Sequence, residues 1–131
     1  MSRDLMRHLP DMTRETVDKI CHALPSAHWA SHHDGGLDAW KVGGKMFACI
    51  GQSNDGVSVK CDSVDTAAFL IEIGAAEKAK YFHRSWVRIP FGTKDAGEFA
   101  ERIHTSYGLI RASLPKKVQV ELAAWQDNDG S

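Results

Sequence analysis

Two kinds of hydrophobic periodicity alternate along this chain. Apolar residues recur with the helical spacing of three to four in three segments, at about 13–24, 62–74 and 95–114. Between these segments, shorter stretches alternate apolar and polar residues as half-buried strands do, at about 38–42, 45–51, 57–61 and 86–91. The predicted order is helix, three-stranded meander, helix, strand, helix. This order is typical of an α+β fold, a two-layer sandwich in which helices pack on one face of an antiparallel sheet.

The helix ends carry their own signals. Thr13 has the position of an N-cap for the first helix, and Pro25 ends that helix. Asp62 is placed to cap the second helix, and the last helix begins near Asp95, which has capping-box spacing to the glutamate that follows. Tyr107 falls on the apolar stripe of the last helix, so its ring is predicted to be buried with a hydrogen-bonded hydroxyl. Lys116 and Lys117 are predicted to lie at the C-terminal end of the same helix, where cations complement the helix dipole.

Two glycine-containing turns connect the strands of the meander. Gly43 and Gly44 tolerate the positive φ angles of a two-residue hairpin turn, and Asn54-Asp55-Gly56 forms the second turn. If both hairpins keep an unbroken alternation, opposed residues share a face, and one face of the meander is apolar. This core face is predicted to hold Met46, Ala48, Ile50, Val57, Val59 and Cys61, and the opposite face Trp40, Lys45, Phe47 and Lys60.

The segment 27–37 admits two interpretations. Trp29 and the histidines of this segment suit an edge strand, whereas Asp34-Gly35-Gly36 is typical of a turn. His28, His32, His33 and Asp34 also raise the possibility of a metal site. Adjacent His32 and His33 would point to opposite sides of a strand, and the spacing of closed zinc sites is missing. Surface histidines are the favoured interpretation, with no metal and no cofactor expected.

Length and composition indicate an ordinary globular domain. The chain has 131 residues, of which 43% are hydrophobic and 25% charged, and its formal net charge is −1. We expect one domain over residues 1–131 with one core and a disordered tail at about 126–131. Cys21, Cys49 and Cys61 form no C-x-x-C pair, so buried reduced thiols in a cytoplasmic monomer are expected. Neither a signal peptide nor a membrane-spanning run is apparent in the sequence.

Several spaced motifs together resemble a known family. They are Lys41-Val-Gly-Gly-Lys45-Met-Phe-Ala48, Val59-Lys-Cys-Asp62, Trp86-Val87, Ser106-Tyr107 and Leu114-Pro-Lys-Lys117. With these motifs the chain resembles the MmcQ/YjbR family of small bacterial proteins from about Thr13 to Lys117. The resemblance implies a frataxin-like α/β sandwich and a DNA-binding protein with a double-wing arrangement of hairpins. It implies no catalytic residue.

A basic segment provides the candidate site for such binding. Five cations and no carboxylate lie between Lys78 and Lys94, although the chain as a whole carries almost no net charge. Tyr81, Phe82 and Trp86 supply rings on which bases stack, and the two hairpin tips are placed to contact phosphates as wings. The predicted nucleic-acid-binding residues are Trp40, Lys41, Lys45, Phe47, Lys60, Arg84, Trp86 and Arg88.

Other functions remain open at this point. The basic segment also suits a solvated edge with its aromatic rings packed under loops, as most charged runs do. The uncovered sheet face equally suits a protein or small-ligand interaction domain. Catalysis is not expected, because neither Cys61 nor Ser106 belongs to a local signature of an activated nucleophile.

Overall fold

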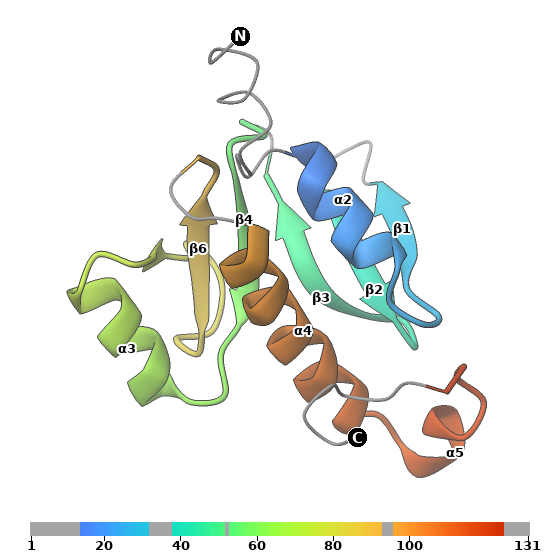
Figure 1. Ribbon diagram of the computed structural model, residues 1–131. Coiled ribbons are helices and arrows are strands. Elements are labelled where there is room, and N and C mark those ends of the chain that lie inside the picture. Colours follow the sequence, from blue (N-terminus) through green and yellow to red (C-terminus); the bar gives the residue numbers. More distant parts are fainter. Residues whose placement is uncertain (1–13, 32–37, 52, 93–95, 125–131) are drawn as a thin grey trace, which may run out of the picture.

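The protein is a mixed α+β structure built on one six-stranded sheet (Figure 1). A computed structural model of the chain describes residues 14–31, 38–51, 53–92 and 96–124. The strands pair antiparallel in the order β1-β2-β3-β4-β6-β5. They are β1 (His28–Ser31), β2 (Asp38–Val42), β3 (Lys45–Ile50), β4 (Gly56–Lys60), β5 (Glu77–Lys78) and β6 (Trp86–Pro90), and the helices described are α2 (Arg14–His22), α3 (Val64–Glu72), α4 (Ala96–Ala112) and α5 (Lys116–Gln119).

Helices α2, α3 and α4 cover one face of the sheet (Figure 1). Val17 and Cys21 of α2 and Phe99, Ile103 and Tyr107 of α4 are fully buried, as their helical spacing predicted. The Tyr107 hydroxyl donates to the Pro25 carbonyl and accepts from Arg111. The opposite face of the sheet is not covered by these helices, and only strands and loops border it. We call it the open face.

A β-bulge in the first hairpin overturns part of the predicted face assignment. Trp40 opposes Ala48 but Lys41 opposes Met46, so Phe47 is an extra residue on β3. The Phe47 ring packs edge-on against Tyr107 of α4 with ring centroids 5.2 Å apart. Trp40, Phe47 and Ala48 therefore all face the helices. The prediction that Trp40 and Phe47 lie on the open face is wrong, because it assumed an unbroken alternation.

The bulge also exchanges the faces of the residues that precede it. Met46 opposes Lys41, and both side chains are partly exposed, so Met46 lies on the open face and not in the core. Lys45 opposes the fully buried Val42 and so belongs to the helix side at the hairpin tip. On the far side of the bulge the prediction is confirmed, since Ile50, Val57 and Val59 are buried in the core.

Ser106 of α4 secures the bulge. Strands β3 and β4 pair only at Ala48–Val59 and Cys49–Ser58, and the next two positions are Phe47 and Lys60. The Ser106 hydroxyl bridges these positions, accepting from the Lys60 amide at 2.9 Å and donating to the Phe47 carbonyl at 2.7 Å. Ser106 is fully buried. A helix side chain thus replaces the ladder hydrogen bonds that the bulge removes.

Several element boundaries differ from the sequence prediction. Ser63, not Asp62, caps α3, because its hydroxyl accepts from the Thr66 amide at 3.0 Å. The last long helix ends at Ala112, and the two lysines predicted at its end lie in the separate short helix α5. For the edge strand β1 the sequence left two interpretations open, and it did not predict the edge strand β5. The expected caps Thr13 and Asp95 lie outside the described residues.

Candidate nucleic-acid interface

The open face presents two rows of side chains that cross the sheet. The register places Lys41, Met46, Lys60 and Trp86 in one row, since Lys41 opposes Met46 and Lys60 opposes Trp86. Ala39, Cys49, Ser58, Arg88 and Glu77 form the neighbouring row. The structure therefore brings four of the predicted site residues to one face: Lys41, Lys60, Trp86 and Arg88.

The loop before β6 holds Lys60 in a hydrogen-bonded network. The Lys60 ammonium donates to the Ser85 hydroxyl at 2.9 Å, and this hydroxyl lies 2.9 Å from Nδ1 of His83. The same Nδ1 accepts from the Ser85 amide, so the Ser85 hydroxyl donates to it as well. None of these partners is an anion. No carboxylate in the part of the chain that the structure describes forms an ion pair with Lys60, so its positive charge is available on the open face.

Arg88 has a different environment. Its guanidinium pairs with Asp55 in the β3–β4 turn and with Glu77 of β5, the latter at 2.9 Å. It also passes directly over Gly56, where an added Cβ would lie 2.7 Å from the guanidinium carbon. The two carboxylates neutralise Arg88, so the structure gives no support to its predicted role as a phosphate ligand.

A groove of about 390 Å³ runs between the open face and the loop after β5. Cys49 and Ser58 form its floor, and Lys80, Tyr81 and Phe82 line its wall. The floor is tightly packed, since Cys49 is only 3% exposed. Burial, assisted by the charge of a neighbouring aspartate, raises the pKa of the Cys49 thiol to about 11, so this cysteine is a neutral thiol near pH 7.

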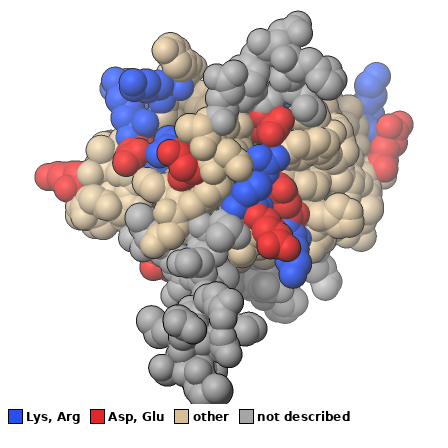
Figure 2. Space-filling model, turned by 90° about the horizontal axis from the view of Figure 1, so that it is seen from above, with Lys and Arg blue, Asp and Glu red and all other residues tan. Residues whose placement is uncertain are grey.

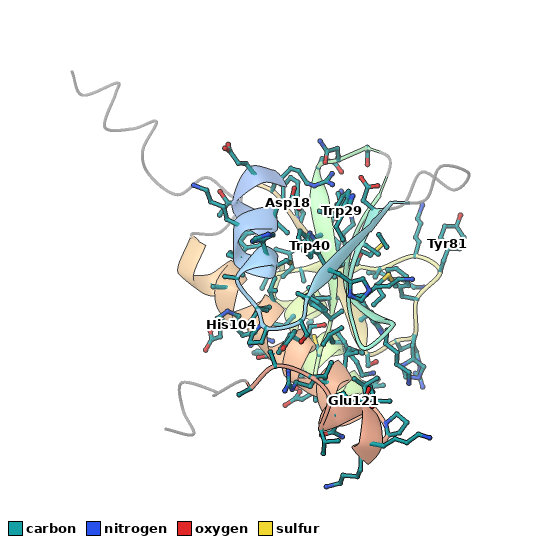
Figure 3. The ribbon with its side chains drawn as sticks, turned by 90° about the vertical axis from the view of Figure 1, so that its right-hand side faces the viewer. Asp18, Trp29, Trp40, Tyr81, His104 and Glu121 are labelled. Atoms are coloured by element: carbon teal, nitrogen blue, oxygen red, sulfur yellow. The ribbon has the colours of Figure 1, made fainter. Side chains whose placement is uncertain are left out.

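Tyr81 is the most unusual side chain of this groove. Its ring is completely exposed and projects on the side of the sheet away from α2 and α4 (Figure 3). Its backbone has φ of +72°, in the left-handed region that non-glycine residues rarely adopt. Behind it, Phe82 packs against Trp86 with ring centroids 4.9 Å apart, which leaves Trp86 partly exposed. The loop thus exposes the Tyr81 ring to water, and its Phe82 ring packs against Trp86 and supports it.

The remaining predicted site residues lie elsewhere. Trp40 is 5% exposed beneath α2, and its indole N–H donates to the Asp18 carboxylate at 2.9 Å. Phe47 is in the core, and Lys45 extends from the helix side of the hairpin tip, as described above. Arg84 is exposed in the loop that carries Ser85. Of the three rings among the predicted site residues, Trp40 and Phe47 are therefore unavailable to a ligand on the open face, and Trp86 remains.

Sequence reasoning missed the anionic and small residues of the interface. Asp55 and Glu77 lie outside the basic segment and meet Arg88 only through strand pairing. Ser58 was detectable, because a serine between two valines of a strand marks the polar face.

Positive charge is local on the face seen in Figure 2. Blue and red side chains alternate across the middle of the molecule, and a separate blue group projects at one edge.

The described residues offer no alternative metal centre. No group of three His, Cys, Asp or Glu side chains in residues 14–31, 38–51, 53–92 and 96–124 is placed to hold a metal ion. His32, His33 and Asp34, the proposed seed of a metal site, lie outside these ranges. Within the same ranges, no helix has both the length and the apolar character that crossing a bilayer requires.

Comparison with known proteins identifies the family of this chain and a solved structure with a similar fold. The sequence model of the YjbR family matches residues 22–109, more than half of the chain. A crystal structure of protein DR2400 from Deinococcus radiodurans, described as a DUF419 domain, superposes with a TM-score of 0.76 at 22% identity. The match covers 92% of this chain and 95% of that chain, and at this identity it shows a shared fold. The search of curated proteins finds no match.

Proposed function

The chain belongs to the YjbR family, and we propose that it binds single-stranded nucleic acid on the open face of its sheet. In this proposal, exposed rings stack on bases and uncompensated cations contact phosphates. The site consists of Tyr81 and Trp86 with four cations around them: Lys41, Lys60, Lys80 and Arg84. It retains four of the predicted residues, Lys41, Lys60, Arg84 and Trp86, and leaves out Trp40, Lys45, Phe47 and Arg88.

The observation that carries the proposal is the completely exposed Tyr81 ring. A left-handed backbone at a non-glycine residue costs about 1–3 kcal/mol, and such strain concentrates at ligand contacts. Because the Tyr81 ring is completely exposed, no packing energy of this ring within the protein offsets the backbone strain. Stacking on a base would bury it, and base stacking tolerates any sequence because every base has a π-face.

The four cations support the same ligand. Each is exposed or partly exposed, and the ion pairs among the described residues involve Arg14 and Arg88 only. A phosphate backbone can therefore bind these cations without breaking an existing ion pair. Because the net charge of the chain is −1, attraction to a polyanion must come from this cluster and must weaken with salt.

The positions of the hairpin tips favour a single strand over a duplex held between two wings. The tips lie at opposite ends of β3, whose six residues span about 20 Å. Gly43 of the first tip packs against Leu114, and Asp55 of the second tip brings a carboxylate. A flat strand surface with an adjoining groove is the geometry that single-strand-binding sheets use. We further propose that the protein acts without catalysis, as a monomer.

Fluorescence anisotropy of a labelled oligothymidylate of about 15 nucleotides tests the proposal. We expect binding at about 50 mM salt that weakens as salt is added. Tyr81→Ala should weaken binding by about 5- to 150-fold, the equivalent of about 1–3 kcal/mol for one stacked base. Phe69→Ala is the matched control, because Phe69 is a ring of α3 that is 57% exposed on the helix side.

Two results would refute this function. One is the absence of binding at low salt, and the other is an equal effect of Tyr81→Ala and Phe69→Ala. Either result would favour the alternative in which the open face contacts a protein or a small molecule.

A further inference from the structure

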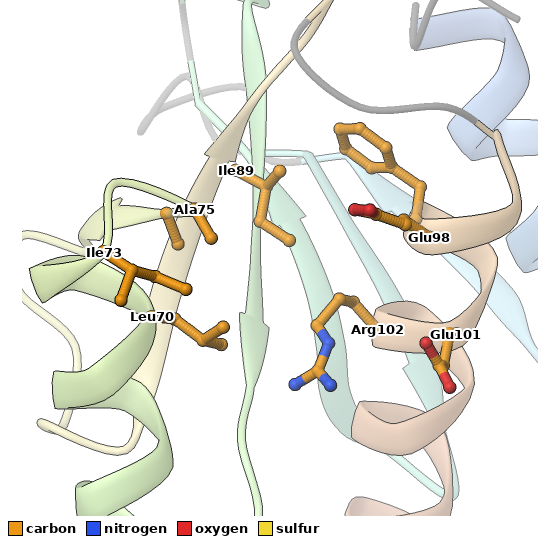
Figure 4. A pocket seen from close by; sticks show the side chains of 9 residues that line it. Leu70, Ile73, Ala75, Ile89, Glu98, Glu101 and Arg102 are labelled. Carbon is orange, nitrogen blue, oxygen red and sulfur yellow. The ribbon is translucent and has the colours of Figure 1, made fainter.

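A second cavity lies on the helix side of the sheet, between α3 and α4 (Figure 4). α4 packs over β3 and β4, while α3 packs over β6 and β5. The gap between the two helices leaves a groove of about 280 Å³ whose floor is formed by Ala76, Ile89 and Phe99. This volume is near the lower limit for small-molecule sites. It lies across the sheet from the proposed nucleic-acid interface.

Apolar side chains also form the outer edge of this groove. Ile73, which lines the cavity, and the neighbouring Phe69 of α3 are each 57% exposed. Leu70 faces the opening from the same helix (Figure 4). Exposed residues of this size next to a concave apolar floor are a feature of ligand-binding grooves. The apolar part of a ligand would gain about 0.8 kcal/mol for each methylene it buries here.

Arg102 gives the groove its chemical character. Its side chain extends from α4 into the space opposite Leu70 (Figure 4). The guanidinium lies close to the buried Cys61 thiol, whose pKa burial raises and the Arg102 charge partly lowers again. A neutral thiol does not compensate a cation, and no carboxylate within the described parts of the chain forms an ion pair with Arg102. Among the described residues that line the groove, Arg102 is the only cation.

We propose that this groove binds a small aliphatic carboxylate, with its acyl chain on Ile89 and Phe99 and its carboxylate on Arg102. A guanidinium binds a carboxylate through two parallel hydrogen bonds, which makes it specific for this group. The volume holds about nine groups of the size of a water molecule, so a chain of about eight carbons fits. Octanoate is the probe of this size.

Two glutamates of α4 also line the groove and set a limit on its affinity for anions. Glu98 lies one turn from Arg102 on the same helix, and Glu101 is adjacent in sequence. Their negative charge opposes the ligand carboxylate through space. Glu101→Gln should therefore bind octanoate more tightly than the wild type does.

Site-resolved NMR titration with octanoate tests the inference, with octan-1-ol as the matched ligand that lacks the charge. In the wild type we expect saturable shifts at the Ile73, Ala76 and Arg102 amides, with octanoate binding about tenfold more tightly than the alcohol. Arg102→Gln should remove this preference. Lys116→Gln, which removes an exposed cation of α5, should retain it.

Ile73→Asp provides a second variant, because a side chain that is 57% exposed can be replaced without disturbing the core. It should abolish octanoate binding while the amide spectrum stays that of a folded protein. The proposal is overturned if octanoate gives no saturable shifts, if octan-1-ol binds as tightly in the wild type, or if Arg102→Gln keeps the preference for the carboxylate. None of these outcomes bears on oligonucleotide binding by the open face.

Discussion

Replacing Ser106 by alanine tests the account of how the bulge is stabilised. The hydroxyl of this fully buried residue accepts from the Lys60 amide and donates to the Phe47 carbonyl. Alanine fits the same space but leaves both backbone groups buried without a partner. A buried polar group that loses its partner costs about 1–3 kcal/mol. For two groups with some local relaxation, we expect the free energy of unfolding to fall by about 2–4 kcal/mol.

A loss of this size is large against the 5–15 kcal/mol that usually stabilises a domain. Urea unfolding followed by circular dichroism should show a lower midpoint with an unchanged slope. Ser113→Ala is the matched control, because the Ser113 hydroxyl also donates to a backbone carbonyl, at 2.6 Å, but the residue is exposed. We expect it to cost less than about 0.5 kcal/mol. Equal losses in the two variants would show that Ser106 does not hold the bulge.

Three further predictions follow from other contacts. Gly43→Ala should lower the free energy of unfolding by about 1–3 kcal/mol, because the φ of Gly43 is +58° and the added Cβ would lie 2.4 Å from Leu114. Gly44 has a φ of +85° but open space around it, so Gly44→Ala should cost only about 1 kcal/mol in the same urea titration. The raised pKa of Cys49, about 11 against 9.0 when unfolded, means that the unfolded state loses the thiol proton first, so stability falls between pH 9 and pH 11. Unfolding at several pH values should show a shallower fall in Cys49→Ala. Trp40→Phe should destabilise the protein by about 1–2 kcal/mol through its lost hydrogen bond, yet leave oligonucleotide anisotropy titrations unchanged, because the indole is buried.

The periodicity of the sequence was sufficient to predict the main elements. The helical stripe of Phe99, Ile103 and Tyr107 and the alternation of Val57 and Val59 each report burial directly, and the structure confirms them. The positive φ angles at Gly43 and Gly44 likewise agree with the hairpin that the glycines predicted. These features depend on residues close together in the chain, which is why a single sequence reveals them.

The face assignment failed because it depended on a distant residue. One extra residue at Phe47 reverses the alternation, and the group that makes this tolerable is Ser106, which lies 59 residues later. No local pattern around Phe47 distinguishes a bulge from a regular strand. The neutralisation of Arg88 was hidden for the same reason, since Asp55 and Glu77 reach it only across strand pairs.

The central claim is that the cations of the open face bind a single strand of nucleic acid. The salt dependence of oligothymidylate binding is its most direct test. Each phosphate contact on a single strand contributes about −0.7 to the slope of log affinity against log salt concentration. Four cations therefore predict a slope of about −2.8 at most, and Lys80→Ala should make it shallower by about 0.7, while Lys116→Ala on α5 leaves it unchanged. A slope near zero, or the same change in both variants, would contradict the claim.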